Sequence, residues 1–396
     1  MTQQENKSIC LLPWDSVAVR PFGTAIPCCR FVLENTIEFA KESRISNDFR
    51  NSPTWVRTRE MMLAGEKTPH CFLCYREEDS GAQSMRTFSI INHLKDGVSK
   101  MPTNTDVFPL KFLEIAFSNL CNLACISCNR SYSSTWASED YKNGRLPHGQ
   151  KALIQHNVEL NNLDLSHVDT IKIIGGEPFM DQDRFIDLLN RLDLKNLTIR
   201  ISTNGTVLPN NELKLLMDQC KNIVLDVSLD GINSVAEWYR WPTKFSDVRR
   251  VMDQYQEWWG DKPNRLLQVH SLIHIYNIWD LDTMIIFLNE NYPSWGIDCD
   301  WIVIPTWQSV SLIPEELKPD LIDKLSHWDS TIKAKTRYGK SNPFSVSILR
   351  LKDTPSSTLE EFKEKTLLLA KERNLDVFKM VPHIAKLFEN KNGNSL

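Results

Sequence analysis

The stretch KFLEIAFSNLCNLACISC, residues 111–128, decides which fold we expect the chain to adopt. Its first part, KFLEIAFS (111–118), is a mostly apolar, strand-like run. Its second part places Cys121, Cys125 and Cys128 on one short loop. Structural zinc takes four ligands, so three cysteines leave one position open. In a four-iron cluster, three thiolates bind three irons and leave the fourth free for a ligand, which is useful only where chemistry takes place.

Apolar strand-like segments and amphipathic helical segments alternate from residue 111 onward. The strand-like segments are 111–118, 169–178, 197–205, 222–231, 266–277 and 298–305. The helical segments between them are 181–192, 211–220, 245–259 and 280–292. This alternation predicts an α/β fold with a parallel sheet and right-handed crossovers. About six strand–helix units are too few for the usual eight-stranded closed barrel, so we expect a partial (β/α)6 barrel that binds ligands at the carboxyl ends of its strands.

The segments on either side of this barrel differ from it in pattern. Residues 1–108 are irregular, contain several early cysteines, and end near the polar, proline-bearing stretch MPTNTDVFPL (101–110). The segment after Pro314 is charged and mostly helical, most clearly in TLEEFKEKTLLLAKERN (358–374). We therefore predict three parts: a cysteine-rich module over 1–108, a barrel over 109–310 and a helical C-terminal extension over 311–396.

Composition excludes several classes of function. The net charge is −4 and there is no long basic run, so the sequence indicates no nucleic-acid or anionic-membrane partner. No stretch of eighteen apolar residues is present, and MTQQENKSIC (1–10) lacks the basic and apolar regions of a signal peptide. We expect a cytoplasmic protein. In that compartment the clustered members of its ten cysteines indicate metal binding rather than disulfides.

The C-x3-C-x2-C loop after the first strand resembles the radical S-adenosylmethionine (radical SAM) enzymes, and the resemblance covers roughly residues 109–308. It implies that Cys121, Cys125 and Cys128 bind a [4Fe-4S] cluster whose open iron chelates the amino and carboxylate groups of S-adenosylmethionine. In that family one electron from the cluster cleaves the sulfonium, and the 5′-deoxyadenosyl radical then abstracts hydrogen from a substrate. The implied electron donor is a reductant protein such as a flavodoxin or ferredoxin.

Motifs at the ends of the next three strands extend the resemblance. The second strand ends in GGEP (175–178), the third in STNG (202–205) and the fourth in SLDG (228–231). The implied contacts of S-adenosylmethionine are Gly175, Gly176, Glu177, Ser202, Asn204, Ser228 and Asp230. Each of these residues taken singly also suits an ordinary turn, and their joint order after the cysteine loop favours the cofactor site. Ser127 stands where the family commonly has an aromatic residue that packs on adenine.

The upstream stretch ICLLPWDSVAVRPFGTAIPCC, residues 9–29, resembles the opening of a SPASM or twitch module. Such modules carry auxiliary four-iron clusters in a subset of radical SAM enzymes, usually after the barrel, whereas this one precedes it. The implied ligands are Cys10, Cys28, Cys71 and Cys74, with Cys29 as the alternative to Cys28. Four thiolates suit structural zinc equally well, and His70 or His93 can replace one of them.

Two hypotheses follow for the whole chain. The first is a radical SAM enzyme, of oxidoreductase or transferase type, that modifies a peptide or protein; a small metabolite is the second choice of substrate. The alternative is a non-enzymatic zinc-binding scaffold that uses the barrel without radical chemistry. An open three-cysteine site favours the enzyme, because structural metal sites are closed.

Overall fold

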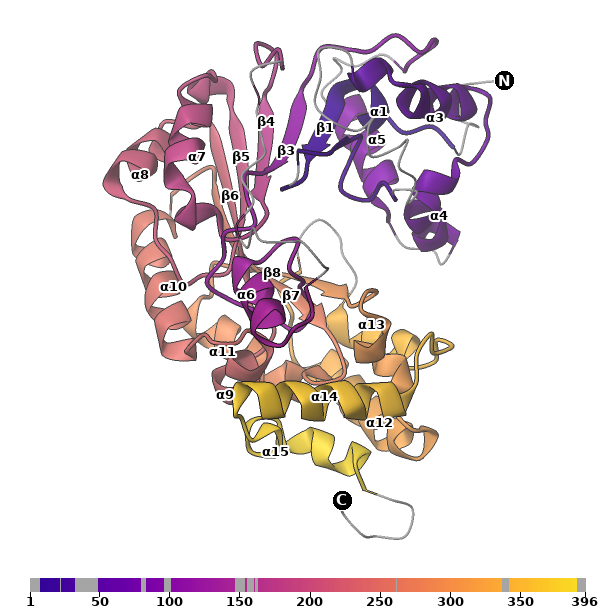
Figure 1. Ribbon diagram of the computed structural model, residues 1–396, viewed down its shortest axis with the longest axis vertical. Coiled ribbons are helices and arrows are strands. Elements are labelled where there is room, and N and C mark those ends of the chain that lie inside the picture. Colours follow the sequence, from indigo (N-terminus) through magenta and orange to yellow (C-terminus); the bar gives the residue numbers. More distant parts are fainter. Residues whose placement is uncertain are drawn as a thin grey trace. The chain divides into compact units, whose positions relative to one another are not determined.

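The computed structural model describes residues 8–21, 23–32, 49–79, 83–95, 101–146, 154, 160, 163–260, 262–336 and 342–389. Its strands form one sheet in the order β2-β1-β3-β4-β5-β6-β7-β8 (Figure 1). The strands are β1 Ser16–Val19, β2 Ala25–Ile26, β3 Phe112–Ala116, β4 Thr170–Ile174, β5 Thr198–Thr203, β6 Asn222–Ser228, β7 Arg265–Ile273 and β8 Gly296–Trp301. The six strands from β3 to β8 are those that the sequence predicts, so the α/β partial barrel is confirmed.

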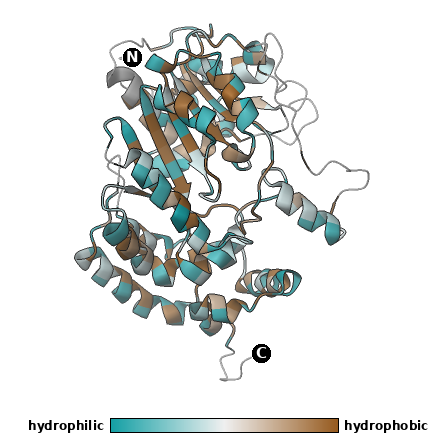
Figure 2. Ribbon diagram, turned by 90° about the vertical axis from the view of Figure 1, so that its left-hand side faces the viewer, coloured by the Kyte–Doolittle hydropathy of each residue, from teal (hydrophilic) through white to brown (hydrophobic). Residues whose placement is uncertain are grey.

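Neighbouring strands run parallel in four of the pairs for which the register is known. These pairs are β1–β3, β3–β4, β4–β5 and β7–β8, whereas β1 and β2 pair antiparallel. In β4 the burial alternates along the strand, with Ile171 and Ile173 fully buried. Such alternation sends one set of side chains into the apolar layer under the helices and leaves the other set on the opposite face of the sheet. Figure 2 shows the apolar character of the strands.

The helices follow the strands in the predicted order. They are α1 Leu12–Asp15, α3 Pro53–Leu63, α4 Phe72–Asp79, α5 Met85–Lys95, α6 Ser134–Lys142, α7 Gln182–Leu189, α8 Asn211–Asp218, α9 Asn233–Tyr239, α10 Phe245–Trp259, α11 Leu281–Asn291, α12 Lys318–Thr331, α13 Pro343–Arg350, α14 Leu359–Arg373 and α15 Val377–Met380. The four predicted crossover helices correspond to α7, α8, α10 and α11, and the helical C-terminal extension is present as α12 to α15. None of the helices in the described residues is long and apolar enough to cross a membrane.

The chain divides into two compact units, which we describe separately. The first comprises Met1–Leu120, Leu146–Ile201 and Pro209–Ile223; the second comprises Cys121–Arg145, Ser202–Leu208 and Val224–Leu396. The first unit holds the upstream cysteines, β1 to β4 and the GGEP turn. The second holds the three-cysteine loop, β7, β8 and the C-terminal helices. The three sequence-based parts, 1–108, 109–310 and 311–396, remain predictions.

Candidate metal centre

The cysteine loop, residues 121–128, lies alongside the segment that follows α9. The backbone N–H of Ala124 donates to the carbonyl of Trp241 at 2.7 Å, and the N–H of Ile126 donates to the carbonyl of Tyr239 at 2.9 Å. Tyr239 is the last residue of α9 and Trp241 lies in the turn after it, so the carbonyls at the end of this helix bind the loop. The two hydrogen bonds fix the backbone of the cysteine loop at Ala124 and Ile126, which lie on either side of Cys125.

Side chains from elsewhere in the second unit bind the remaining carbonyls of the cysteine loop. The indole N–H of Trp136, on α6, donates to the carbonyl of Cys125 at 2.7 Å. The amide of Gln308 donates to the carbonyl of Ile126 at 3.0 Å and accepts from the hydroxyl of Tyr239 at 2.6 Å. Satisfied buried polar networks of this kind specify one conformation, so the loop conformation is set by protein contacts.

The sulfur of Cys121 accepts hydrogen bonds from its own unit. The backbone N–H of Leu123 lies 3.5 Å from Cys121 Sγ, and the side-chain nitrogen of Asn204 lies 3.8 Å from it. Asn204 also donates to Asn122 Oδ1 at 2.8 Å, and its own oxygen accepts from the backbone N–H of Thr206 at 2.9 Å. Hydrogen bonds to cysteinyl sulfur are one of the means by which proteins set the potential of an iron–sulfur cluster.

The sulfur of Cys125 lies beside a buried ion pair. Arg240 Nη1 is 3.8 Å from Cys125 Sγ, and Arg240 Nη2 is 2.7 Å from Asp230 Oδ2. Asp230 is fully buried and also accepts from the backbone N–H of Leu272 at 2.6 Å. Burial raises the pKa of Cys125, and the nearby charges of Arg240 and Arg373 act in the opposite direction. Asp230, which the sequence suggests as a cofactor contact, thus holds Arg240 against a metal-ligand candidate.

The thiol of Cys128, the third cysteine of the loop, lines a cavity. Burial, with the neighbouring Cys125 as the next cause, raises the pKa of Cys128 to about 12. A cavity of about 410 Å³ adjoins this thiol. It is lined by Cys128, Asn129, Arg130, Ser131, Trp136 and Asp140. A thiol with a pKa raised in this way is protonated at neutral pH, and binding of a metal releases its proton.

The donor set of the cysteine loop fits a [4Fe-4S] cluster. Three thiols project from a fixed loop, two guanidinium groups act on the sulfur of Cys125, and N–H groups are directed at the sulfur of Cys121. One further buried donor, Arg373 Nη1, has no hydrogen-bond partner among the described residues. Within those same residues, no three Cys, His, Asp or Glu side chains converge as ligands of a single metal ion.

The GGEP turn packs against the end of the preceding strand within the first unit. The N–H of Gly176 donates to the carbonyl of Ser118 at 3.2 Å, and the N–H of Glu177 donates to the carbonyl of Leu120 at 2.7 Å. A Cβ on Gly176 would lie only 2.0 Å from the oxygen of Leu120. Gly175 has a φ of 106°, and its Cβ would lie 2.6 Å from that of Ala116. Because neither glycine has a side chain, the GGEP turn can approach the backbone of the residues that precede Cys121 this closely.

Comparison with known proteins identifies this segment. The model of the family described as "Radical SAM superfamily" matches residues 115–292. This segment belongs to the radical SAM superfamily. The match confirms the expected family, and with it a [4Fe-4S] cluster and S-adenosylmethionine as the cofactors that such a domain takes.

Three similar proteins illustrate the extent of the likeness. The probable GTP 3′,8-cyclase of Methanocaldococcus jannaschii is 32% identical over 183 residues, which are 46% of this chain and 56% of that protein. The chain thus spans about half the length of the curated relative that it matches. The structure of native anSMEcpe with bound AdoMet is 16% identical over 58% of this chain and 64% of that chain, with a TM-score of 0.38. Streptococcus suis SuiB bound to S-adenosylmethionine is 13% identical over 62% and 51%, with a TM-score of 0.37.

The other suggested cofactor contacts of the radical SAM domain lie at strand ends, as predicted. Ser202 lies one residue before the end of β5, and Ser228 is the last residue of β6; both are half-buried. Glu177 is almost fully buried, and its Oε1 accepts from the N–H of Phe179 at 3.2 Å. Asn204 lies against Cys121, as described above. The roles of these residues toward S-adenosylmethionine remain predictions.

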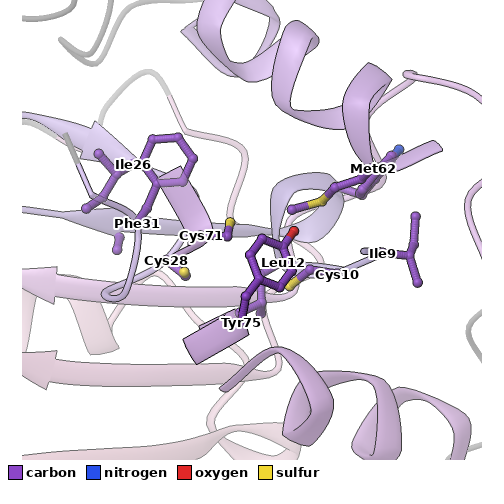
Figure 3. Close-up of a cluster of buried hydrophobic side chains, with 11 residues drawn as sticks. Ile9, Cys10, Leu12, Ile26, Cys28, Phe31, Met62, Cys71 and Tyr75 are labelled. Atoms are coloured by element: carbon purple, nitrogen blue, oxygen red, sulfur yellow. The ribbon is translucent and has the colours of Figure 1, made fainter. Parts of the chain in front are cut away.

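The N-terminal cysteine group, Cys10, Cys28, Cys71 and Cys74, comes together in the first unit. Figure 3 shows Cys10, Cys28 and Cys71 in one buried cluster with Tyr75, and they come from three separate segments. Burial raises the pKa of Cys28, and the charges of Cys29, Cys10, Cys71 and Cys74 act in the same direction. Three of the four thiols of the predicted auxiliary site therefore share one buried cluster, and the fourth, Cys74, is buried on α4 directly after Cys71.

The alternatives to these ligands have other surroundings. Burial raises the pKa of Cys29 to about 11, and the charged groups acting on it are led by Glu114 and Lys172 rather than by other cysteines. His70 has its Nδ1 2.9 Å from the carbonyl of Val32, and its ring stacks on Phe31. The side chain of His93 lies outside the described residues. This arrangement favours Cys28 over Cys29 as a ligand.

Sequence reasoning missed four residues that hold the cysteine loop: Trp136, Arg240, Gln308 and Arg373. Arg240 had a weak signal, because it is a basic residue that ends the short helix after SLDG, close to the strand ends. Arg373 had none, since it lies in a charged helix that looks like a solvated surface. Their contacts with the loop arise only from the tertiary fold.

Proposed function

We propose that the chain is a radical SAM enzyme whose catalytic [4Fe-4S] cluster is held by Cys121, Cys125 and Cys128. The observation that carries this proposal is the set of three thiols on one protein-clamped loop inside the matched segment. When bound, the cluster supplies the electron that cleaves S-adenosylmethionine to a 5′-deoxyadenosyl radical, which abstracts hydrogen from a substrate.

The residues of the chain have separate tasks in this proposal. Asn204 and the N–H of Leu123 donate to the sulfur of Cys121, and Arg240 places a positive charge 3.8 Å from the sulfur of Cys125. Both features favour the ionised ligand that a cluster requires. Glu177 accepts a hydrogen bond from the methionyl ammonium of S-adenosylmethionine. Ser202 and Ser228, at the ends of β5 and β6, bind the carboxylate and the ribose of the same cofactor.

The proposal includes an auxiliary [4Fe-4S] cluster on Cys10, Cys28, Cys71 and Cys74. The support is that Cys10, Cys28 and Cys71 lie in one buried cluster although they come from three separate segments, and that Cys74 is buried on α4, which directly follows Cys71. Four thiolates are the full complement of one such cluster. Zinc is the rival occupant, and metal analysis distinguishes the two because zinc thiolates are colourless.

A peptide or protein is the substrate class that we propose, by analogy with the SPASM-type modules that the N-terminal spacing resembles. Gly23, which lies between Cys10 and Cys28, supports the resemblance, because it has a φ of 75° and forms the turn between β1 and β2. GTP is the second compound to be tested, because the similar archaeal protein is named a probable GTP cyclase. We do not propose GTP as the substrate, since that likeness covers only part of either chain.

The test is production of 5′-deoxyadenosine by anaerobically reconstituted protein with dithionite and S-adenosylmethionine. We expect the product from wild type and its loss in Cys128→Ala. Cys220→Ala is the control, because Cys220 is a thiol outside both cysteine groups and far along the chain from the motif. A colourless, zinc-loaded wild type that forms no 5′-deoxyadenosine would instead support the scaffold alternative. Stimulation of product formation by peptides but not by GTP would support the peptidyl substrate class.

A further inference from the structure

The C-terminal extension contributes a buried arginine to the surroundings of the cysteine loop. Arg373 lies in the last turn of α14, which Asn374 ends in a left-handed conformation with a φ of 53°. The side chain of Arg373 is 0% exposed, and its Nε and Nη2 donate to the two carboxylate oxygens of Glu139, on α6, at 2.9 and 3.0 Å. Nη2 also donates to the carbonyl of Ala124 at 2.9 Å. Helix α14 therefore reaches the middle of the cysteine loop.

Two tryptophan rings enclose this guanidinium group. Its central carbon lies 5.0 Å from the ring centroid of Trp136 and 4.9 Å from that of Trp241. Both tryptophans also bind the cysteine loop, since the indole of Trp136 donates to the carbonyl of Cys125 and the carbonyl of Trp241 accepts from the N–H of Ala124. Every described partner of Arg373 is thus either part of the loop or bonded to it, apart from Glu139 on the helix that follows.

A fully buried arginine is costly unless its charge is paired and its donors are bound. Arg373 has a bidentate carboxylate, which is the strongest common arrangement for arginine. The next residue along the helix adds a second link, because Glu372 pairs with Arg145, whose Nε is 2.8 Å from Asp140 Oδ1 at the end of α6. Two successive side chains of α14 therefore bind the segment formed by the cysteine loop, α6 and Arg145.

We propose that Arg373 is a positioning residue that locks the cysteine loop in the conformation that holds the catalytic cluster, so that the C-terminal extension is part of the metal centre. The inference rests on the proposed cluster at Cys121, Cys125 and Cys128. Its second effect is electrostatic, because the guanidinium group holds its charge against the loop, with Nη2 2.9 Å from the carbonyl of Ala124, the residue before Cys125. Removal of that charge lowers the reduction potential of the cluster, since a nearby cation favours the more negative reduced state.

Three variants separate the two effects. Arg373→Met keeps the length of the side chain but removes the charge and all donors. Arg373→Lys keeps the charge but cannot supply the planar fork that Glu139 and the carbonyl of Ala124 engage. Lys371→Met is the matched control, because Lys371 is an exposed cation two residues before Arg373 on the same helix.

Three measurements are made on each full-length variant. These are the iron retained per chain after buffer exchange, the midpoint potential of the cluster whose EPR signal changes on addition of S-adenosylmethionine, and the alkylation rate of Cys125 in the metal-free protein. We expect Arg373→Met to lose this cluster roughly tenfold faster than wild type, as is typical when an outer ligand contact of a metal site is removed. It should also lower the potential. Faster alkylation of Cys125 is expected in Arg373→Lys, which keeps the charge, so that the rate there reports a loosened loop.

Arg373→Lys should lose the cluster faster than wild type with a potential near that of wild type, and Lys371→Met should match wild type in all three measurements. Arg373→Met with wild-type iron retention, potential and alkylation rate would overturn the inference. If Arg373→Met does not fold, Arg373→Lys still decides the positioning role through the alkylation rate, where a wild-type value would overturn it. Failure of wild type itself to bind iron on the cysteine loop would refute the proposed function instead, so the two failures are distinguishable.

Discussion

Substitution of Gly176 by alanine tests how the GGEP turn supports the entry to the cysteine loop. An alanine Cβ here would lie 2.0 Å from the oxygen of Leu120 and 2.6 Å from its carbonyl carbon. Real Cβ contacts are essentially never shorter than 3.0 Å, so the two backbones must separate by about 1 Å (3.0 − 2.0). That separation breaks the hydrogen bond of 2.7 Å between the N–H of Glu177 and the carbonyl of Leu120.

The expected cost follows from these two changes. Forcing extra atoms into a packed site costs about 1–3 kcal/mol, and losing a backbone hydrogen bond costs about 1 kcal/mol. We therefore expect Gly176→Ala to destabilise the first unit by about 2–4 kcal/mol. Each kcal/mol lowers the Tm of a unit of this size by roughly 2–4 °C, so the Tm should fall by at least about 4 °C.

The assay is thermal unfolding of the metal-free protein followed by circular dichroism. Gly144→Ala is the control, because Gly144 has a φ of 68° but no heavy atom within 4 Å of its Cβ position. It isolates backbone strain, which costs about 1 kcal/mol for alanine in that region. A Gly176→Ala variant that melts within 1 °C of wild type, or above Gly144→Ala, would refute the close-approach argument.

Three further predictions concern the two metal sites and the buried core. Cys28→Ser should lose about four irons per chain, whereas Cys29→Ser keeps them, because only Cys28 lies among the other module cysteines; iron and sulfide analysis checks this, and equal losses would contradict it. Asn204→Ala should bind the catalytic cluster roughly tenfold more weakly, because it removes a donor to the sulfur of Cys121; unchanged iron retention would count against that role. Burial lowers the pKa of His274 well below 6.5, so its neutral form stabilises the fold above pH 6.5 and that stability is lost as the pH falls, by up to about 1.4 kcal/mol per pH unit. His274→Gln should therefore flatten the fall in Tm between pH 6.5 and 5, and an unchanged slope would show that other groups cause it.

The strands and crossover helices of the barrel could be predicted because their apolar periods are long and clear. Helix α10 occupies residues Phe245–Trp259, which is the predicted range. The early strands β1 and β2 could not be predicted in the same way. All four residues of β1 are buried, which removes the alternation, and β2 has two residues.

The three cysteines that we propose as cluster ligands could be picked out from the sequence because their spacing is local. The choice between Cys28 and Cys29 was not, since adjacent residues share any spacing, and only the fold shows which thiol faces the others. Arg373 lies 249 positions from Ala124, whose carbonyl it binds. Long-range contacts of this kind leave no periodic signal, and the charged helix around Arg373 has the composition of a solvated surface.

The most direct test of the central claim compares iron in the wild type with iron in the Cys121/Cys125/Cys128→Ala variant after anaerobic reconstitution. The account predicts about eight irons in wild type and about four in the variant, with 5′-deoxyadenosine formed by wild type alone. About four irons in wild type and none in the variant, with zinc in both, would assign the N-terminal cysteine group to zinc and keep the enzyme. Equal iron in the two proteins, or no 5′-deoxyadenosine from folded, iron-loaded wild type, would contradict the claim that the cysteine loop is a radical SAM centre.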